Sequence, residues 1–226
     1  MAQRDIDNTL SRPARVVLAS TSPRRRDLIG ELDLRVDLAA AIGTEGPRRG
    51  GETPEDYVLR LSAEKAMGVA GKYPGTIVIG ADTAVVLGGD VLGKPADEDE
   101  AWDMLLSLRG RTHTVITGVT VVDSDAGRQR GSVRSSEVVM RSYDDREISD
   151  YVASGESADK AGAYAVQDED FRPASVVRGC YPNVVGFPLC DVVKLLADLG
   201  VDAPIRHGSQ ATARCDDCLF EGTSTQ

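Results

Sequence analysis

The stretch "VIGADTAVVLGGDVLGKPAD", residues 78–97, decides the fold, because it joins an apolar run to two glycine turns and a lysine beside a proline. The apolar run predicts a buried strand that ends at Asp82. Gly88 to Lys94 fits the G-x-x-x-x-G-K spacing of a phosphate-binding P-loop. A P-loop needs Ser or Thr after its lysine, whereas Pro95 follows here and disfavours helical geometry at Lys94. We therefore reject a P-loop and predict that Asp82 is either a functional carboxylate or an ordinary turn cap.

The segments on either side of this stretch alternate between helical and strand patterns. Ser22–Pro23 and Thr53–Pro54 each combine a capping residue with a proline at the first helical position, which is typical of helix starts. The fold class expected from this mixture is α/β, with a mixed sheet and flanking helices, although the patterns do not give the strand order. The predicted strands lie within 15–20, 75–93, 112–123, 131–144 and 174–186; the predicted helices are 21–32, 53–70, 97–110, 144–155 and 188–200; the segments 35–52 and most of 156–173 are predicted to be irregular.

The length and the polarity of the two ends indicate one domain. Residues 1–14 are a polar extension, residues 15–202 carry the predicted elements, and residues 203–226 are polar and aperiodic, which predicts a mobile C-terminal tail. No apolar run approaches a membrane-spanning length, and the N-terminus lacks the apolar core of a signal peptide. Four cysteines do not make a dense disulfide framework, so we expect a cytoplasmic protein without a membrane partner.

The charge balance restricts the kind of partner. The chain has 26 Lys and Arg against 36 Asp and Glu, which gives a formal net charge of −10. Phosphate backbones attract basic faces, so this balance argues against a protein that coats nucleic acid. A small anionic ligand in a locally basic pocket remains compatible with it.

The segment "ASTSPRRR", residues 19–26, is a candidate anion site. Arginines in the first turn of a helix oppose the positive end of the helix dipole. A bound phosphate would resolve this conflict, because free backbone N–H groups, the hydroxyls of Ser20 and Ser22, and guanidinium groups would all face one anion. At most two of the three arginines can face one site, and we favour Arg24 and Arg25. A solvated basic turn explains the segment equally well.

Lys65 and Gln167 are two further candidates. Lys65 falls on the buried stripe of its helix, in line with Val58 and Leu61, so its ammonium must either pair with an anion or extend to solvent. Gln167 lies in "DKAGAYAVQDED", residues 159–170, and its amide could accept from N3–H and donate to O4 of uracil or thymine. An ordinary Gly/Ala loop is the alternative for that segment.

Two other features look structural or incidental. His113 lies early in a predicted strand, where a histidine is more often structural than catalytic. Cys215-x-x-Cys218 with His207 nearby lacks the four well-spaced ligands of a structural zinc site, so we set zinc aside.

Taken together, long motifs in a constant order resemble the Maf family of nucleoside triphosphate pyrophosphatases, which have the inosine-triphosphatase-like fold. The resemblance runs from about Val16 to Leu199 and leaves the polar extension and the tail outside one catalytic Maf-like domain. It rests on "LASTSPRRRDLI", "GETPEDYVLRLSAEKA", the stretch from "IGADTAVV" to "GRTHTVITGV", "SGESADKAGAYAVQD" and "GCYPNVVGFPL".

This resemblance implies two lobes of an elongated sheet around a central cleft, a divalent cation (Mg²⁺ or Mn²⁺), and hydrolysis between the α- and β-phosphates. Asp82 would be the proton acceptor and a metal ligand, with Glu45 as the second metal-side carboxylate. Lys94 and Lys65 would act in catalysis, and together with Arg24 and Arg25 they would neutralise the triphosphate. Arg24, Thr83 and Gln167 are the positions that go with the choice of base. The functional residues carried over are Ser20, Arg24, Arg25, Lys65, Asp82, Thr83, Lys94 and Gln167.

The resemblance also bears on the base and on partners. Ala81–Asp82–Thr83 followed later by Gln167 is similar to the branch that acts on dTTP and UTP. A 7-methyl-GTP pyrophosphatase, which would more often show Ser-Asp-Gln and a Glu at these places, and a non-catalytic nucleotide-binding regulator of cell division are the alternatives. Thr44 replaces the Asp usual in the family, which implies weaker metal binding. A homodimer is expected from the family alone.

Overall fold

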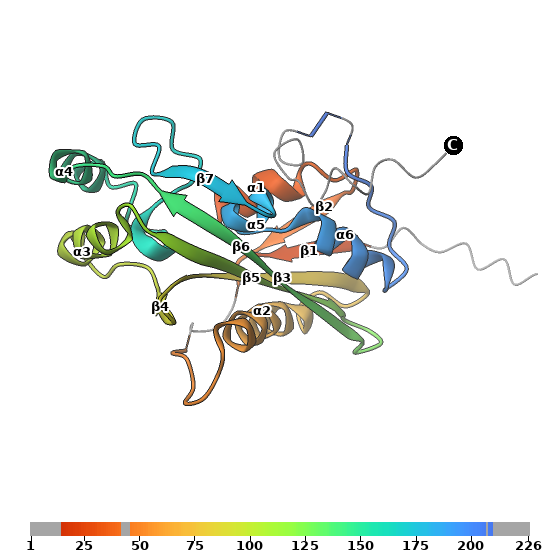
Figure 1. Ribbon diagram of the computed structural model, residues 1–226. Coiled ribbons are helices and arrows are strands. Elements are labelled where there is room, and N and C mark those ends of the chain that lie inside the picture. The colour runs from red at the N-terminus through yellow and green to blue at the C-terminus, as the bar shows by residue number, and fades with distance from the viewer. Residues whose placement is uncertain (1–14, 42–45, 207, 210–226) are drawn as a thin grey trace, which may run out of the picture.

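The computed structural model describes residues 15–41, 46–206, 208 and 209. Within them, seven strands form one mixed sheet flanked by helices (Figure 1), which confirms the predicted fold class. The strands are β1 (Arg15–Ala19), β2 (Val36–Ala39), β3 (Thr76–Leu87), β4 (Asp90–Leu92), β5 (Thr112–Asp123), β6 (Gln129–Met140) and β7 (Ala174–Arg178); the helices are α1 (Pro23–Ile29), α2 (Pro54–Ala70), α3 (Glu98–Leu108), α4 (Asp145–Ala153), the 3₁₀ turn η1 (Ala161–Ala163), α5 (Tyr181–Val185) and α6 (Leu189–Ala197).

The sheet joins a parallel half to an antiparallel half. The strand order is β2-β1-β3-β5-β6-β7, with β4 paired to β3. Strand β1 runs parallel to both β2 and β3, whereas β5, β6 and β7 follow β3 in antiparallel pairs. In the central pair, Asp82 lies opposite Gly118 and Thr83 lies opposite Thr117. The long strands β3 and β5 therefore form the backbone on which both halves are built.

The strand pairing along one edge of β3 is interrupted in the middle of the strand. Strand β1 pairs with β3 as far as Ile79, and β4 pairs with it from Val85 onward. Among the described strands, residues 80–84 therefore have a hydrogen-bonded neighbour only on the β5 side. This break in the sheet leaves the edge of β3 at Asp82 and Thr83 without a described strand beside it.

Three details differ from the sequence predictions. Strand β3 does not end at Asp82 but continues to Leu87, because its pairing with β5 extends as far as Val86 opposite Thr114. Strand β2 lies in the segment predicted to be irregular; it has four residues, and its one strand neighbour among the described residues is β1. The short helix α5 follows β7 where only a partial strand was predicted.

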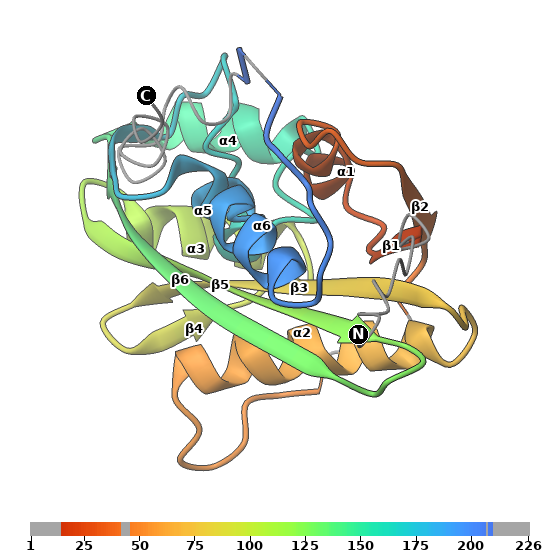
Figure 2. The ribbon, with the colours of Figure 1, turned by 90° about the vertical axis from the view of Figure 1, so that its right-hand side faces the viewer.

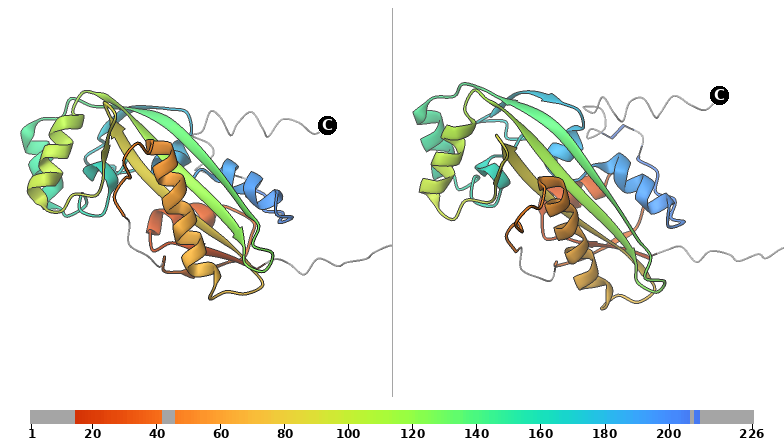
Figure 3. Two further views of the ribbon diagram at one scale, coloured as in Figure 1. Left: turned by 90° about the horizontal axis from the view of Figure 1, so that it is seen from below. Right: turned by 60° about the horizontal axis from the view of Figure 1, so that its bottom comes forward.

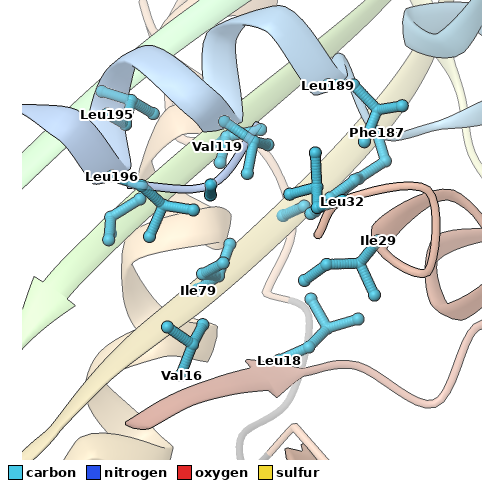
Figure 4. Packing of buried hydrophobic residues seen from close by; sticks show 14 of the residues in the cluster. Val16, Leu18, Ile29, Leu32, Ile79, Val119, Phe187, Leu189, Leu195 and Leu196 are labelled. Atoms are coloured by element: carbon cyan, nitrogen blue, oxygen red, sulfur yellow. The ribbon is translucent and has the colours of Figure 1, made fainter. Parts of the chain in front are cut away.

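Helices cover the sheet on both faces. Helix α2 runs along one face of β3 and β5, while α1, α5 and α6 lie on the other (Figures 2 and 3). The α6 face holds one apolar core, in which Leu196 of α6 points toward Ile79 and Val16 of the sheet (Figure 4). A second core joins the far ends of β3 and β5 to α3 and α4. The two cores form the two lobes.

Two glycines let α2 lie unusually close to the sheet. A Cβ at Gly80 would be 2.1 Å from the carbonyl oxygen of Ser62, and a Cβ at Gly118 would be 2.6 Å from that of Val58. Any side chain at either position would push the helix away, because real Cβ atoms do not approach a backbone so closely. A buried hydrogen bond of 2.7 Å between the hydroxyls of Ser62 and Thr120 also joins the helix to β5.

The second lobe contains a buried histidine–tyrosine pair. His113 Nε2 and the Tyr164 hydroxyl are 2.7 Å apart, and the rings meet edge to face. Burial lowers the pKa of His113 from 6.5 to about 4 and raises that of Tyr164. His113 is thus a neutral core residue that fixes Tyr164, in agreement with the structural role predicted for it.

The chain after α6 packs back onto the first lobe. Asp33 N donates to Pro204 O and Arg206 N donates to Glu31 O, each at 2.8 Å, and Ala203 is buried. Residues 203–206, where the tail was predicted to begin, are thus held against the segment between α1 and β2. The N-terminal extension 1–14 and the tail 210–226 lie outside the described residues. No helix in the described part of the chain is long and apolar enough to cross a membrane.

Replacing Gly80 by Ala is expected to lower the free energy of unfolding by about 3 kcal/mol, because the added methyl collides with the backbone of α2. The matched control is Gly71→Ala at the end of the same helix, where φ is −61° and no atom lies near the added Cβ. Urea denaturation followed by circular dichroism measures both. Equal stabilities of the two variants would contradict the close approach.

His113 is expected to make the protein acid-sensitive. Its folded-state pKa is depressed, so the unfolded state binds the extra proton between pH 6.5 and about 4, and stability is lost as pH falls through that window. Between pH 7 and pH 4.5, His113→Gln should lose about 2 kcal/mol less unfolding free energy than the wild type. Urea denaturation at several pH values provides the comparison, and parallel pH profiles would argue against a buried neutral imidazole.

Candidate functional site

A cleft of about 320 Å³ opens at the break in the sheet, between the two lobes. It lies where β1 has ended and β4 has begun, so residues from both halves of the chain reach it. Glu45, the predicted second metal-side carboxylate, and its neighbour Thr44 lie outside the described residues. The other predicted site residues all line this cleft: Ser20, Arg24, Arg25, Lys65, Asp82, Thr83, Lys94 and Gln167.

An ion pair stands at the centre of the cleft. Lys65 Nζ of α2 lies 2.5 Å from Asp82 Oδ1 of β3, and the two side chains are 14% and 9% exposed. The lysine on the buried stripe therefore pairs with an anion, which was one of the two outcomes expected for it. Removing either partner would leave an unpaired, desolvated charge, which is costly. The contact therefore favours one arrangement of the two side chains.

Arg25 and Thr83 belong to a chain of hydrogen bonds on the opposite face of the sheet. Arg25 donates from Nη2 to Thr83 Oγ1 (3.0 Å) and from Nε to Gly186 O (2.9 Å). Thr83 Oγ1 lies 3.0 Å from Thr117 Oγ1, and the Thr117 hydroxyl donates to Asn183 O at 3.0 Å. Two donors of Arg25 are therefore used within the protein.

Arg24 also lines the cleft, where it meets the carboxylate of Asp159. Its Nη1 is 3.8 Å from Asp159 Oδ2, while Asp159 Oδ1 accepts from Lys160 Nζ at 2.7 Å. Lys160 is buried and also donates to Glu156. Partial burial alone would raise the pKa of Asp159, but the hydrogen bond from Lys160 and the charges of Lys160 and Arg24 outweigh it and hold the pKa below its usual value.

The loop that carries Gln167 is tied to the segment that carries Lys94. Gly162 N donates to Gly93 O at 2.9 Å, next to Lys94. Gly162 has φ +68°, and its missing side chain leaves room for Val85.

Ser20, just before α1, also lines the cleft, and its Oγ accepts from Ser22 N at 3.2 Å. Ser22 is the N-cap residue of α1, as predicted, but its side chain makes no capping hydrogen bond.

The cleft has two chemically different sides because Asp82 and Thr83 are neighbours in a strand and point to opposite faces. Asp82 points toward α2 and its lysine. Thr83 points toward α5, into a wall that contains Val85, Val115 and Val185. Such a division suits a ligand with a charged part and a flat apolar part.

The charge of the cleft is opposite to that of the chain. Among the described residues, five cationic side chains and two carboxylates line it, although the whole protein has a formal charge of −10. Arg24 and Arg25 both contribute, whereas Arg26 is exposed and is not part of the lining. Sequence reasoning missed Asp159, because no local pattern distinguishes a lining carboxylate from the other acidic residues of this chain.

The donor set fits a divalent cation only in part. The described residues contain no group of three or more His, Cys, Asp or Glu side chains that could hold a metal. Asp82 offers one carboxylate within the cleft. Mg²⁺ is commonly held by one or two carboxylates together with the phosphates of a substrate, so the cleft fits a metal that arrives with a phosphorylated ligand.

Comparison with known proteins identifies the family. The family model described as "Maf-like protein" matches residues 15–199. A "dTTP/UTP pyrophosphatase" of Pelotomaculum thermopropionicum is 47% identical over 82% of this chain and 96% of its own, and one of Myxococcus xanthus is 47% identical over 84% and 95%. The relative of the same name in Dehalococcoides mccartyi is 35% identical over 96% of both chains.

Among solved structures, a nucleoside-triphosphatase (dITP/XTP pyrophosphatase) of Mycobacterium abscessus is similar with a TM-score of 0.35 and 16% identity, over 57% of this chain and 75% of that one. The family match covers nearly the whole described domain, including every described residue placed at the cleft. The chain therefore belongs to the family of Maf-like proteins.

Proposed function

We propose that this Maf-like protein is a nucleoside triphosphate pyrophosphatase that hydrolyses dTTP and UTP to the monophosphate and diphosphate. The observation that carries the proposal is the basic cleft around the Lys65–Asp82 pair, which lies at a break in the sheet of an acidic protein. The name shared by relatives up to 47% identical, dTTP/UTP pyrophosphatase, supports the same substrates.

The triphosphate would occupy the charged side of the cleft. Lys94 and Lys65 would neutralise its oxygens, with Ser20 and Arg24 at the opposite wall. Arg25 would add its positive charge to this set, while its guanidinium group holds Thr83 in place through a hydrogen bond. Positioning and charge stabilisation supply most of what phosphoryl-type transfer requires, so a fixed set of cations is the main catalytic need.

A divalent cation, Mg²⁺ or Mn²⁺, would be held by Asp82 together with the substrate phosphates. When bound, such an ion would polarise a phosphate and make a bound water more acidic. Glu45 stays a prediction as the second carboxylate, since it lies outside the described residues. Action in the cytoplasm and assembly as a homodimer are expectations from the sequence that enter this proposal unchanged.

Asp82 would act as the proton acceptor. A water molecule would attack the α-phosphorus, the bond from that phosphorus to the α–β bridging oxygen would break, and the diphosphate would leave on that oxygen. Asp82 would take the proton that the water loses. Lys65 fixes the position of this carboxylate through their 2.5 Å contact, so the acceptor is oriented before the substrate arrives.

Asp82→Asn is expected to lower kcat for diphosphate release by at least about 100-fold while nucleotide binding stays measurable, because the amide keeps the size of the side chain but cannot accept the proton. Diphosphate release and titration calorimetry measure the two properties. Asp103→Asn, an exposed carboxylate of α3, is the matched control. Turnover by Asp82→Asn at the wild-type rate would exclude Asp82 as the base.

The base preference is tested by a panel of nucleotides with and without Mg²⁺. We expect dTTP and UTP to be hydrolysed at least about 10-fold faster than GTP and 7-methyl-GTP, because Gln167 and Thr83 offer the cleft neutral polar groups suited to a pyrimidine edge. A preference for 7-methyl-GTP would indicate the alternative specificity. Binding without turnover on any nucleotide would indicate a regulator.

A further inference from the structure

Thr83 lies on the side of the cleft that faces away from α2, together with the apolar residues Val85, Val115 and Val185. Another hydroxyl residue of this region, Tyr164, is 2.7 Å from His113 Nε2 through its own hydroxyl. If the proposed function holds, the base of the nucleotide is the part of the substrate that fits an apolar wall. The hydrogen-bonding capacity of the Thr83 hydroxyl therefore decides which base edge can lie against it.

The direction of the hydrogen bonds behind Thr83 follows from the chemistry of the atoms. Thr83 Oγ1, Thr117 Oγ1 and Asn183 O form a line with successive separations of 3.0 Å. A carbonyl oxygen can only accept, so the proton of Thr117 points to Asn183. Thr117 has no second proton, and the contact between the two threonines therefore uses the proton of Thr83.

The other side of Thr83 is equally constrained. Arg25 can only donate, so its Nη2 contact occupies one lone pair of Thr83 Oγ1. A hydroxyl oxygen has one proton and two lone pairs, and one lone pair is then left to face the cleft. The acceptor at the far end, the carbonyl oxygen of Asn183, belongs to a residue that is held in place. Asn183 is buried, and its Nδ2 donates to Val115 O and Ser136 Oγ at 3.0 and 2.9 Å.

We infer that Thr117 is a specificity-determining positioning residue, which makes Thr83 an obligate hydrogen-bond acceptor toward the base. The base edge of uracil and thymine carries a single N–H, at N3, so Thr83 would accept from N3–H and Gln167 would be left to donate to O4. Cytosine has a lone pair at N3 and would meet the lone pair of Thr83. Guanine also carries a ring N–H, so the contact discriminates chiefly against cytosine.

Thr117→Val tests the inference, because it keeps the shape of a fully buried side chain and removes the hydroxyl that takes the proton of Thr83. Thr83 could then rotate and donate to cytosine N3. The ratio of kcat/KM for UTP to kcat/KM for CTP should fall by about 10-fold or more. We expect most of this change to appear in KM rather than in kcat, since a positioning residue behind the base does not touch the reacting phosphates.

Two controls separate this role from a structural one. Thr117→Ser keeps the hydroxyl and should keep the wild-type ratio. Thr120→Val changes another buried, hydrogen-bonded threonine of β5 on the α2 face, and it should also leave the ratio unchanged. A folded Thr117→Val enzyme with the wild-type ratio, or an equal fall in Thr120→Val, would overturn the inference.

A second measurement needs no change at Thr117. N3-methyl-UTP should be a poor substrate of the wild type, and Thr83→Ala should restore its kcat/KM relative to UTP by about 10-fold, because the methyl group would fill the space left at Thr83. If Thr83→Ala does not restore the hydrolysis of N3-methyl-UTP, N3 of the base does not lie against Thr83, and the inference is overturned. The proposed function fails separately, if the wild type does not prefer dTTP and UTP at all.

Discussion

The site depends first on how closely α2 lies against β3 and β5. Gly80 and Gly118 allow the helix backbone to approach the strands to distances that a Cβ would forbid. Lys65 and Asp82 belong to elements separated in sequence, and only this approach brings them to 2.5 Å. Since interiors are close-packed and transmit small displacements, the spacing of one helix from one sheet sets the geometry of the proposed catalytic centre.

The break in the sheet explains why the cleft has two chemically distinct sides. Residues 80–84 of β3 lack a described strand on the side where β1 ends and β4 begins. Consecutive residues of a strand point to opposite faces, so Asp82 and Thr83 serve different sides of one cleft. In the proposed function, a nucleotide would lie across this break with its phosphates on one face and its base on the other.

The electrostatics of the cleft depend on fixed partners rather than on net charge. A chain of formal charge −10 gathers Arg24, Arg25, Lys65, Lys94 and Lys160 around a small space, and most of them are held by a specific acceptor. Arg25 is held by Thr83 and Gly186, and Lys160 by Glu156 and Asp159. Cations oriented before the substrate arrives do not need to reorganise during the reaction, which is the source of electrostatic catalysis.

By itself the sequence determined the helices and most strands, because these depend on local signals. The candidate site residues came partly from such signals and partly from the family resemblance, and the structure places the described ones at one cleft. Proline and capping residues mark the starts of α1 and α2, and Lys65 stands out as a cation on an apolar stripe. The extension of β3 past Asp82, the strand β2, the place of Asp159 at the cleft and the line from Thr83 through Thr117 to Asn183 were decided only by the tertiary structure. Each of these results from pairing between residues far apart along the chain, and such pairing leaves no periodic pattern in either segment alone.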